Sequence, residues 1–329
     1  MERLAPFTLH RPGTAAQAAA LLAGLDGAKI VAGGTDLLPN LRRGLVDPRC
    51  LIDLTPMAGF DAVETHQGQW RLGAGVTLAT LERHAGLAQA LPALVQAASQ
   101  VAGPGHRSAA TLGGNLCQDT RCIFYNQSAW WRAANGGCLK FEGDTCHVAP
   151  QGRRCHAAYQ GDLAPALLAY GAEVEIVGTE TRHRRPLADL YRDDGAAHLT
   201  LGATEVVAAI HVPAQGHGQL SAYRKVRMRG AMDFPLAGVA VALRLDGGVL
   251  VELAIGVSGT NSHPLRLQGT DALLGHAVDG PLLEALGKLV RKQVSPMRST
   301  VTPSNHRRLV AVAITQRLVR ELAGAGVAA

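Results

Sequence analysis

The first part of the chain alternates between helical and strand-like patterns of apolar positions. Thr14 and Gln17 form a capping box before the apolar run of residues 18–25, which predicts a helix. Short apolar runs at residues 29–32 and 51–54 predict buried strands, and the first of these ends at a pair of glycines. A helix, a strand, a loop and a strand in this order indicate a small α/β unit.

The middle of the chain begins with clear periodicity and then loses it. Thr77 caps a predicted helix that extends to Leu87, and Pro92 starts another that extends to residue 101. From about residue 103 to 159, Gly, polar and aromatic residues dominate, and neither helical nor strand spacing is sustained. Strands are predicted at residues 70–75, 173–177, 198–201 and 205–212.

A polar Pro/Gly segment at residues 213–218 is the clearest boundary in the chain. Beyond it, strand patterns precede amphipathic helices, and this order predicts an α+β C-terminal domain. The strands are expected at residues 221–226, 236–245 and 249–257, and the helices at residues 281–294 and 304–323. We therefore divide the chain into residues 1–213, with subdomains of about 1–57 and 58–213, and residues 219–329.

Composition narrows the class of protein. Apolar residues make up 47% of the 329 positions and charged residues 18%, which is typical of a folded globular chain. The net charge of +6 comes without a long Lys/Arg run, so no nucleic-acid partner is expected. The densest basic spots, residues 182–185 and 306–308, are interpreted as solvated helix ends and loops.

Neither a secretory signal nor an apolar stretch of about 18 residues is visible, so we expect a cytoplasmic protein without a membrane partner. Thiols stay reduced in that compartment. The six cysteines therefore indicate metal ligation or catalysis more than disulfides.

Two glycine loops share one chemistry. The first follows the strand at residues 29–32 and contains Gly33, Gly34 and Thr35; the second, at residues 109–116, contains another Gly pair between a Thr and an Asn. Paired glycines let backbone N–H groups approach an anion, because no Cβ stands in the way. Neither loop has Rossmann or Walker spacing. Each alone is typical of a tight turn, whereas two together favour one shared diphosphate ligand.

A cysteine-rich segment follows the second loop. Its four cysteines are Cys122, Cys138, Cys146 and Cys155, and two tryptophans lie among them. A segment without regular periodicity needs something to organise it, and a metal centre does so. The long spacings favour an iron–sulfur cluster over zinc, although His147 and His156 each follow a cysteine and keep zinc open; unligated thiols are a third alternative. Cys117 competes with Cys122 for a ligand role, and we place it in packing near the cofactor.

Four motifs together resemble the flavin subunits of molybdenum hydroxylases, such as xanthine dehydrogenase and carbon monoxide dehydrogenase. They are the two glycine loops, the segment of residues 161–166, and Lys225 placed eight residues before Asp233. The resemblance covers nearly the whole chain. It implies an α+β fold, with a two-part, PCMH-like FAD-binding domain carrying a cysteine-rich insert at about residues 117–157, and an α+β C-terminal domain.

The resemblance also implies which residues bind FAD. In the family, an Asp at the position of Asp162 contacts the ribityl chain. The implied FAD-binding residues are Lys29, Ile30, Val31, Ala32, Gly33, Gly34, Thr35, Asp36, Val101, Thr111, Gly113, Gly114, Asn115, Asp162 and Lys225. No catalytic residue is expected, because the substrate site would lie on another chain.

The insert resembles one branch of the family, the 4-hydroxybenzoyl-CoA reductases, in the runs at residues 113–122 and 125–131. That branch carries a [4Fe–4S] cluster in the flavin subunit, which implies Cys122, Cys138, Cys146 and Cys155 as ligands. The implied partners are a molybdenum-cofactor large subunit and a [2Fe–2S] small subunit, in a doubled heterotrimer, with reduced ferredoxin as electron donor. Electrons would then run toward molybdenum for reductive dehydroxylation of 4-hydroxybenzoyl-CoA to benzoyl-CoA.

Two alternatives remain open. One is the flavin subunit of an outward-running xanthine/CO-dehydrogenase-type hydroxylase, in which NAD meets the flavin. The other is a zinc-stabilised binding protein without redox chemistry.

Overall fold

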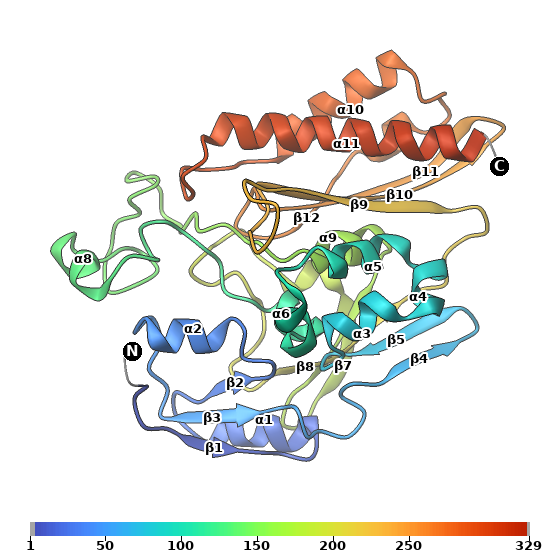
Figure 1. Ribbon diagram of the computed structural model, residues 1–329. Helices are drawn as coiled ribbons and strands as arrows, with labels where there is room; N and C mark the ends of the chain where they lie inside the picture. The colour runs from blue at the N-terminus through green and yellow to red at the C-terminus, as the bar shows by residue number, and fades with distance from the viewer. Residues whose placement is uncertain (1–3, 328–329) are drawn as a thin grey trace.

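The structure is a computed structural model that describes residues 4–327. Its N-terminal part is a small parallel sheet in the order β1-β3-β2, formed by β1 (Thr8–His10), β2 (Lys29–Val31) and β3 (Cys50–Asp53). Helices α1 (Ala15–Gly24) and α2 (Leu37–Arg42) lie on opposite sides of this sheet (Figure 1). The predicted N-cap is confirmed, since the Thr14 hydroxyl accepts from Gln17 N at 3.2 Å, whereas the Gln17 side chain accepts from Gly13 N at 2.8 Å and not from Thr14 N as a capping box requires.

The second sheet is antiparallel and has five strands, in the order β4-β5-β8-β6-β7. Its strands are β4 (Val63–His66), β5 (Gln69–Gly73), β6 (Glu173–Val177), β7 (Arg182–Pro186) and β8 (Val206–Val212). One face buries apolar residues such as Leu72, Val174 and Ile210, whereas the other carries charged side chains. Residues 182–185, which we interpreted as a charged loop, are therefore a strand at the edge of this sheet. Charged residues suit an edge strand because they discourage pairing with another chain.

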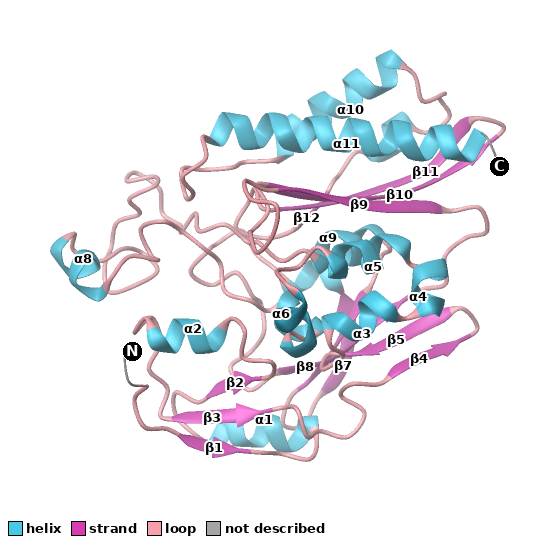
Figure 2. Ribbon diagram, in the orientation of Figure 1, coloured by secondary structure: helices cyan, strands magenta, loops and turns pink. Residues whose placement is uncertain are grey.

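Helices fill the layer between this sheet and the next one (Figure 2). They are α3 (Leu78–Arg83), α4 (Ala85–Ala90), α5 (Pro92–Ser99), α6 (Pro104–Ala109), α7 (Leu112–Leu116) and α9 (Leu163–Ala169). The single helix predicted from Thr77 to Leu87 is wrong. It ends at Arg83, because His84 adopts an extended backbone and its Nδ1 accepts from Leu87 N at 3.2 Å, which caps α4.

The C-terminal sheet has the order β12-β11-β10-β9 and is antiparallel throughout. Its strands are β9 (Leu220–Val226), β10 (Ala237–Asp246), β11 (Val249–Ser258) and β12 (Leu265–Arg266). The long helices α10 (Gly280–Gln293) and α11 (Ser304–Val327) cover its outer face (Figure 1), and alternate residues of β10, such as Val239 and Val241, pack toward them. The residues between these, Ala240 and Ala242, join the core that contains α9.

The segment from Cys117 to Asp162 has one helix, α8 (Ala129–Ala134), which projects from the body of the molecule (Figure 1). The strand predicted at residues 198–201 is wrong, since only Leu199 forms an isolated bridge, to Tyr191. This segment makes its backbone contacts with the end of the short 3-10 helix η1 (Leu187–Leu190) and the residues after it, where Thr200 N donates to Leu190 O and Arg192 N donates to His198 O, each at 2.9 Å. A second 3-10 helix, η2 (Thr270–Leu273), precedes α10. Among the helices of residues 4–327, none has the length and apolar character needed to cross a membrane.

Candidate cofactor site

The two glycine loops meet at one cavity. Its volume is about 640 Å³, within the range of small-molecule sites, and its walls include residues 28–37 together with Thr111, Gly113 and Gly114. A Cβ at Gly33 would lie 1.8 Å from the carbonyl oxygen of Ala109, so only glycine permits this approach of the two segments. The sequence therefore brings the two loops together through a backbone contact that a side chain would block.

The first loop offers open hydrogen-bond donors. Gly34 has a φ of +69°, which glycine adopts without strain. Within residues 4–327, the backbone N–H groups of Gly34, Thr35 and Asp36 donate no hydrogen bond. Unpaired N–H groups at the entry to a helix attract phosphate oxygens. This loop thus fits a diphosphate.

The second loop uses more of its polar groups internally. The Thr111 hydroxyl accepts from Gly114 N at 3.1 Å, and Gly113 N donates to Ala74 O at 2.7 Å. Asn115, a predicted FAD residue, does not line the cavity, since its Oδ1 accepts from Leu163 N at 3.1 Å at the start of α9. The second loop therefore contributes to the cavity mainly its backbone wall and the Thr111 hydroxyl.

Two other predicted residues, Asp162 and Lys225, lie away from the cavity wall as a buried pair. Lys225 Nζ lies 3.0 Å from Asp162 Oδ2, and these side chains are only 1% and 4% exposed. Lys225 also donates to the carbonyl of Gln100 at 3.3 Å, next to Val101. Burial raises the pKa of Asp162, whereas the nearby Lys225 ammonium opposes the rise. The ion pair thus holds a carboxylate where water cannot reach it.

Tyr223 joins this buried pair and was not predicted. Its hydroxyl donates to Asp162 Oδ1 at 2.6 Å, and it is 2% exposed. A signal was available, because Tyr223 and Lys225 are two positions apart on β9 and so share one face of the strand.

Asp36 has a different role in the structure from the other predicted residues of its loop. Its Oδ1 pairs with the Arg121 guanidinium, and its Oδ2 accepts from Asp119 N at 3.0 Å. Arg121 also donates to Asn40 Oδ1 at 2.8 Å. The Asp36 carboxylate is therefore engaged by the segment that leads into the cysteine insert.

The four cysteines of the insert share one neighbourhood. Burial raises the pKa of Cys122, and Cys146 and Cys138 lie close enough to raise it further. Burial also raises the pKa of Cys155 to about 12, and Cys146 and Cys122 again contribute. Such thiols hold their protons at neutral pH unless a metal replaces them.

Backbone donors point at two of these sulfurs. Ala157 N donates to Cys155 Sγ at 3.4 Å, and the N–H groups of Phe124 and Tyr125 face Cys122. Leu45, Tyr125 and Ala157 form an apolar cover over Cys122 and Cys155. N–H···S bonds and apolar cover are features of iron–sulfur sites.

Within residues 4–327, no three Cys, His, Asp or Glu side chains converge closely enough to hold a single metal ion. His147, one of the residues that kept zinc open, is hydrogen-bonded through Nε2 to Gly137 O at 2.6 Å. His147 is therefore already engaged by a backbone carbonyl.

Cys117 lies on the other side of this region. It lines the cavity, and it contributes to raising the pKa of Tyr159 and Tyr191 rather than that of the insert thiols. Burial alone raises its own pKa to about 12. Its surroundings are therefore those of a packing residue next to the cavity.

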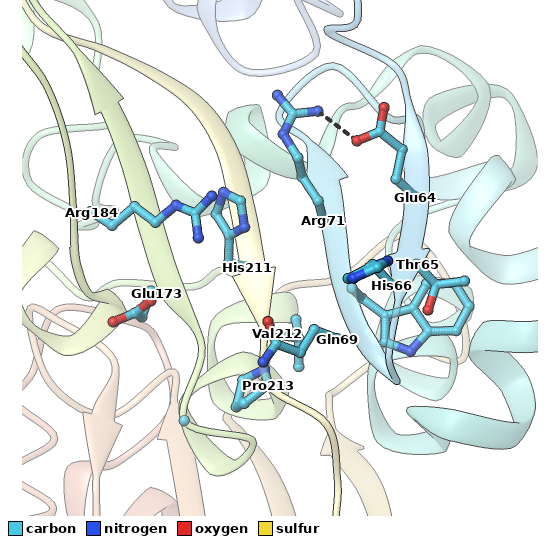
Figure 3. Close-up of a pocket in the computed structure, with 12 residues that line it drawn as sticks. Glu64, Thr65, His66, Gln69, Arg71, Glu173, Arg184, His211, Val212 and Pro213 are labelled. Atoms are coloured by element: carbon cyan, nitrogen blue, oxygen red, sulfur yellow. Dashed lines mark hydrogen bonds and ion pairs between the residues drawn. The ribbon is translucent and has the colours of Figure 1, made fainter.

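A second cavity, of about 530 Å³, lies on the charged face of the five-stranded sheet (Figure 3). Arg71 pairs with Glu64 there at 3.4 Å, and the buried Glu175 beside it accepts from His211 Nε2 at 2.6 Å and pairs with Arg182 at 2.5 Å. These charged side chains therefore form ion pairs and hydrogen bonds with one another. Glu173 and Arg184 also line this cavity, so its wall carries both acidic and basic side chains.

Comparison with known proteins gives a consistent result. Residues 5–215 match the family described as the FAD binding domain in molybdopterin dehydrogenase, and residues 221–322 match the CO dehydrogenase flavoprotein C-terminal domain. The chain is 34% identical to the aldehyde oxidoreductase FAD-binding subunit PaoB of Escherichia coli K12, over 82% of this chain and 86% of that protein. It is 28% identical to the xanthine dehydrogenase FAD-binding subunit of Escherichia coli O157:H7, over 96% of each.

Among solved structures, reconstituted CO dehydrogenase from Oligotropha carboxidovorans contains a similar chain. The two superpose with a TM-score of 0.81 at 25% identity, covering 98% of this chain and 99% of that one. The predicted fold class, a two-part FAD-binding domain followed by an α+β domain, is confirmed by these matches.

Proposed function

The chain belongs to the family of FAD-binding domains of molybdopterin dehydrogenases, and from that premise we propose that it is the electron-transfer flavin subunit of a molybdenum enzyme complex. The observation that carries the proposal is the cavity between the two glycine loops, where the N–H groups of Gly34 and Thr35 are open to an anion. The complex would include a molybdenum-cofactor large subunit and a [2Fe–2S] small subunit. The division of this chain into two domains, residues 1–213 and 219–329, is also part of the proposal.

The first loop would hold the FAD diphosphate, with Thr111 contributing a hydroxyl from the opposite wall. Asp162, fixed by Lys225 and Tyr223, would orient the part of the cofactor that reaches the buried pair. Bound FAD would supply redox chemistry in steps of one or two electrons, while the chain supplies placement and charge.

We further propose that Cys122, Cys138, Cys146 and Cys155 hold a [4Fe–4S] cluster beside the flavin. The shared neighbourhood of the four thiols, the N–H donors aimed at two of them and the apolar cover support this. We also propose a cytoplasmic location, because thiols that serve as ligands have to stay reduced.

The direction of electron flow separates two candidate functions. The names of the relatives, an aldehyde oxidoreductase and a xanthine dehydrogenase, favour a hydroxylase whose electrons leave the molybdenum site through this chain. The resemblance of the insert to the 4-hydroxybenzoyl-CoA reductases favours the opposite flow, from reduced ferredoxin toward dehydroxylation of 4-hydroxybenzoyl-CoA to benzoyl-CoA. The first candidate has the broader support, since those relatives match over most of their length.

Anaerobic purification of the complete complex tests both the proposed flavin and the proposed cluster. We expect flavin absorption and, for the cluster, about four irons in this chain. Cys122→Ser should lose that iron and Cys117→Ser should keep it; equal loss in both variants would contradict the ligand assignment.

The same preparation then decides the direction. Bleaching of the flavin by an aldehyde or by xanthine, measured by stopped-flow absorbance, supports outward flow. Oxidation of dithionite-reduced complex by 4-hydroxybenzoyl-CoA supports inward flow. A complex without flavin absorption would refute the proposed function as a whole.

A further inference from the structure

Lys140 is a buried lysine in the middle of the cysteine insert, between Cys138 and Cys146. Its side chain is 6% exposed. Its ammonium lies within hydrogen-bond distance of four acceptors, which are Asp119 Oδ1 at 2.6 Å, Gly195 O at 2.9 Å, and the carbonyl and hydroxyl oxygens of Thr120. Because an ammonium has three hydrogens to share among these four acceptors, each of its hydrogens has a partner inside the protein.

The acceptors of Lys140 lead directly to the first glycine loop. Asp119 N donates to Asp36 Oδ2 at 3.0 Å, and Arg121, two residues further on, pairs with Asp36 Oδ1. Asp36 and Asp119 line the cofactor cavity together with Lys140. One wall of the cavity is thus made by the insert, and it is attached to the loop through the Asp36 carboxylate.

The same acceptors also lead to the cysteines. Arg121 immediately precedes Cys122 in the chain. Gly195, which accepts from Lys140 and from the Thr120 hydroxyl, donates its N–H to Cys155 O at 2.9 Å. A Cβ at Gly195 would lie 2.7 Å from Ala157 N, so the segments fit closely here.

The charges of this network balance. Two carboxylates, Asp36 and Asp119, face two cations, Arg121 and Lys140, and all four side chains are at most about one-third exposed. Removing one member leaves its partner without compensation in a region of restricted solvent access, which is costly. Movement of the insert away from the loop therefore requires the network to break as a unit.

We propose that the Asp36–Asp119–Arg121–Lys140 network couples the cofactor loop to the cysteine insert, so that a ligand that orders the loop also orders the insert. Lys140 is the positioning residue at its centre. The inference rests on the proposed function, because it takes the ligand of the loop to be FAD. Coupling between two such sites is reciprocal, so an ordered insert also strengthens FAD binding.

Hydrogen–deuterium exchange on the deflavinated complex, with and without added FAD, tests the coupling. In the wild type, FAD should slow amide exchange in residues 118–146 about tenfold, a typical coupling factor. Lys140→Met should abolish this FAD dependence while exchange in α10 stays unchanged. Lys288→Met, at a 75% exposed position in α10, is the matched control and should keep the wild-type response.

Asp36→Asn is the second variant, since it keeps the shape of the side chain and weakens only the ionic contacts. It should reduce the FAD dependence even if Lys140→Met folds poorly. A wild type whose insert ignores FAD, or variants that respond as fully as the wild type, would overturn the coupling.

Flavin content and iron content are measured in the same samples. A wild type that binds no FAD would refute the proposed function, whereas normal FAD binding without protection of the insert would refute the coupling alone.

Discussion

Gly33→Ala is the sharpest test of the cofactor cavity, because it adds a single carbon at the contact between the two glycine loops. The added Cβ would lie 1.8 Å from Ala109 O, 2.5 Å from Ala109 C and 3.0 Å from Ala110 N. All three are backbone atoms, so no side-chain rotation can relieve the contact. The loops have to separate by roughly 1 Å, a strain typical of overpacked sites.

The expected size of the effect follows from this separation. Overpacking of this kind lowers the free energy of unfolding by about 1–3 kcal/mol. Direct hydrogen bonds from the loop to a phosphate tolerate little change in length, and losing one or two charge-assisted bonds costs about 1.5–3 kcal/mol each. The dissociation constant for FAD should therefore rise at least about tenfold.

FAD binding is measured by fluorescence titration of deflavinated protein, and folding by thermal melting of the same samples. Gly105→Ala in α6 is the matched control, since nothing lies within 4 Å of its added Cβ. It should bind FAD as the wild type does. Wild-type affinity in Gly33→Ala, or equal losses in the two variants, would show that the loop contact does not shape the FAD site.

Three further substitutions test other parts of the structure. Glu175→Gln should lower the free energy of unfolding by about 2 kcal/mol at pH 7. Burial raises the pKa of Glu175, but the hydrogen bond from His211 and the other partners outweigh it and hold this pKa below its ordinary value of 4.5, so the difference in stability from wild type should disappear as the pH falls through the lowered pKa. A difference in urea melts that does not change with pH would contradict this. Lys225→Met should leave Asp162 buried without its cation and lower the free energy of unfolding by about 3 kcal/mol. It should also shift the flavin midpoint potential to a more negative value, and Lys225→Arg should restore part of that potential. An unchanged redox titration would refute a flavin role for this lysine. Arg307→Leu should lower the free energy of unfolding by about 3 kcal/mol, since this fully buried guanidinium donates to three backbone carbonyls, and a wild-type urea midpoint would argue against that role.

Sequence alone predicted the elements whose apolar pattern is set by one buried face. The strands near residues 29 and 51 and the helices α10 and α11 appear within a few residues of their predicted positions. The family motifs predicted the fold class, which the comparisons confirm. The glycine loops meet at one cavity as expected, because glycine is the residue that such a backbone approach requires.

Sequence patterns failed where both faces of an element are buried, or where neither is. Every residue of α9 is buried between two sheets, so its run Leu163–Ala169 has no polar face to reveal a helical period. Residues 182–186 form an edge strand that is mostly exposed and reads as a charged loop. In both cases the tertiary position, rather than the local pattern, decides the structure.

Pairings between distant residues were also beyond a single sequence. Asp36 pairs with Arg121, 85 positions away, and nothing in the loop itself indicates that its carboxylate faces the insert rather than a ligand. Lys140 is equally hidden, since an isolated lysine in an irregular segment is usually solvated. The cysteine ligands remain a prediction that the iron measurement will decide.

The contact of Tyr223 and Lys225 with Asp162 has a consequence for how such proteins diversify. The carboxylate belongs to the first family domain, while the tyrosine and the lysine belong to the second. A recombination event between the two domains would separate a buried acid from its partners unless the donor lineage carried matching residues. A chimaera that joins the first domain of this chain to the second domain of a distant relative should therefore need the tyrosine and the lysine carried over with it.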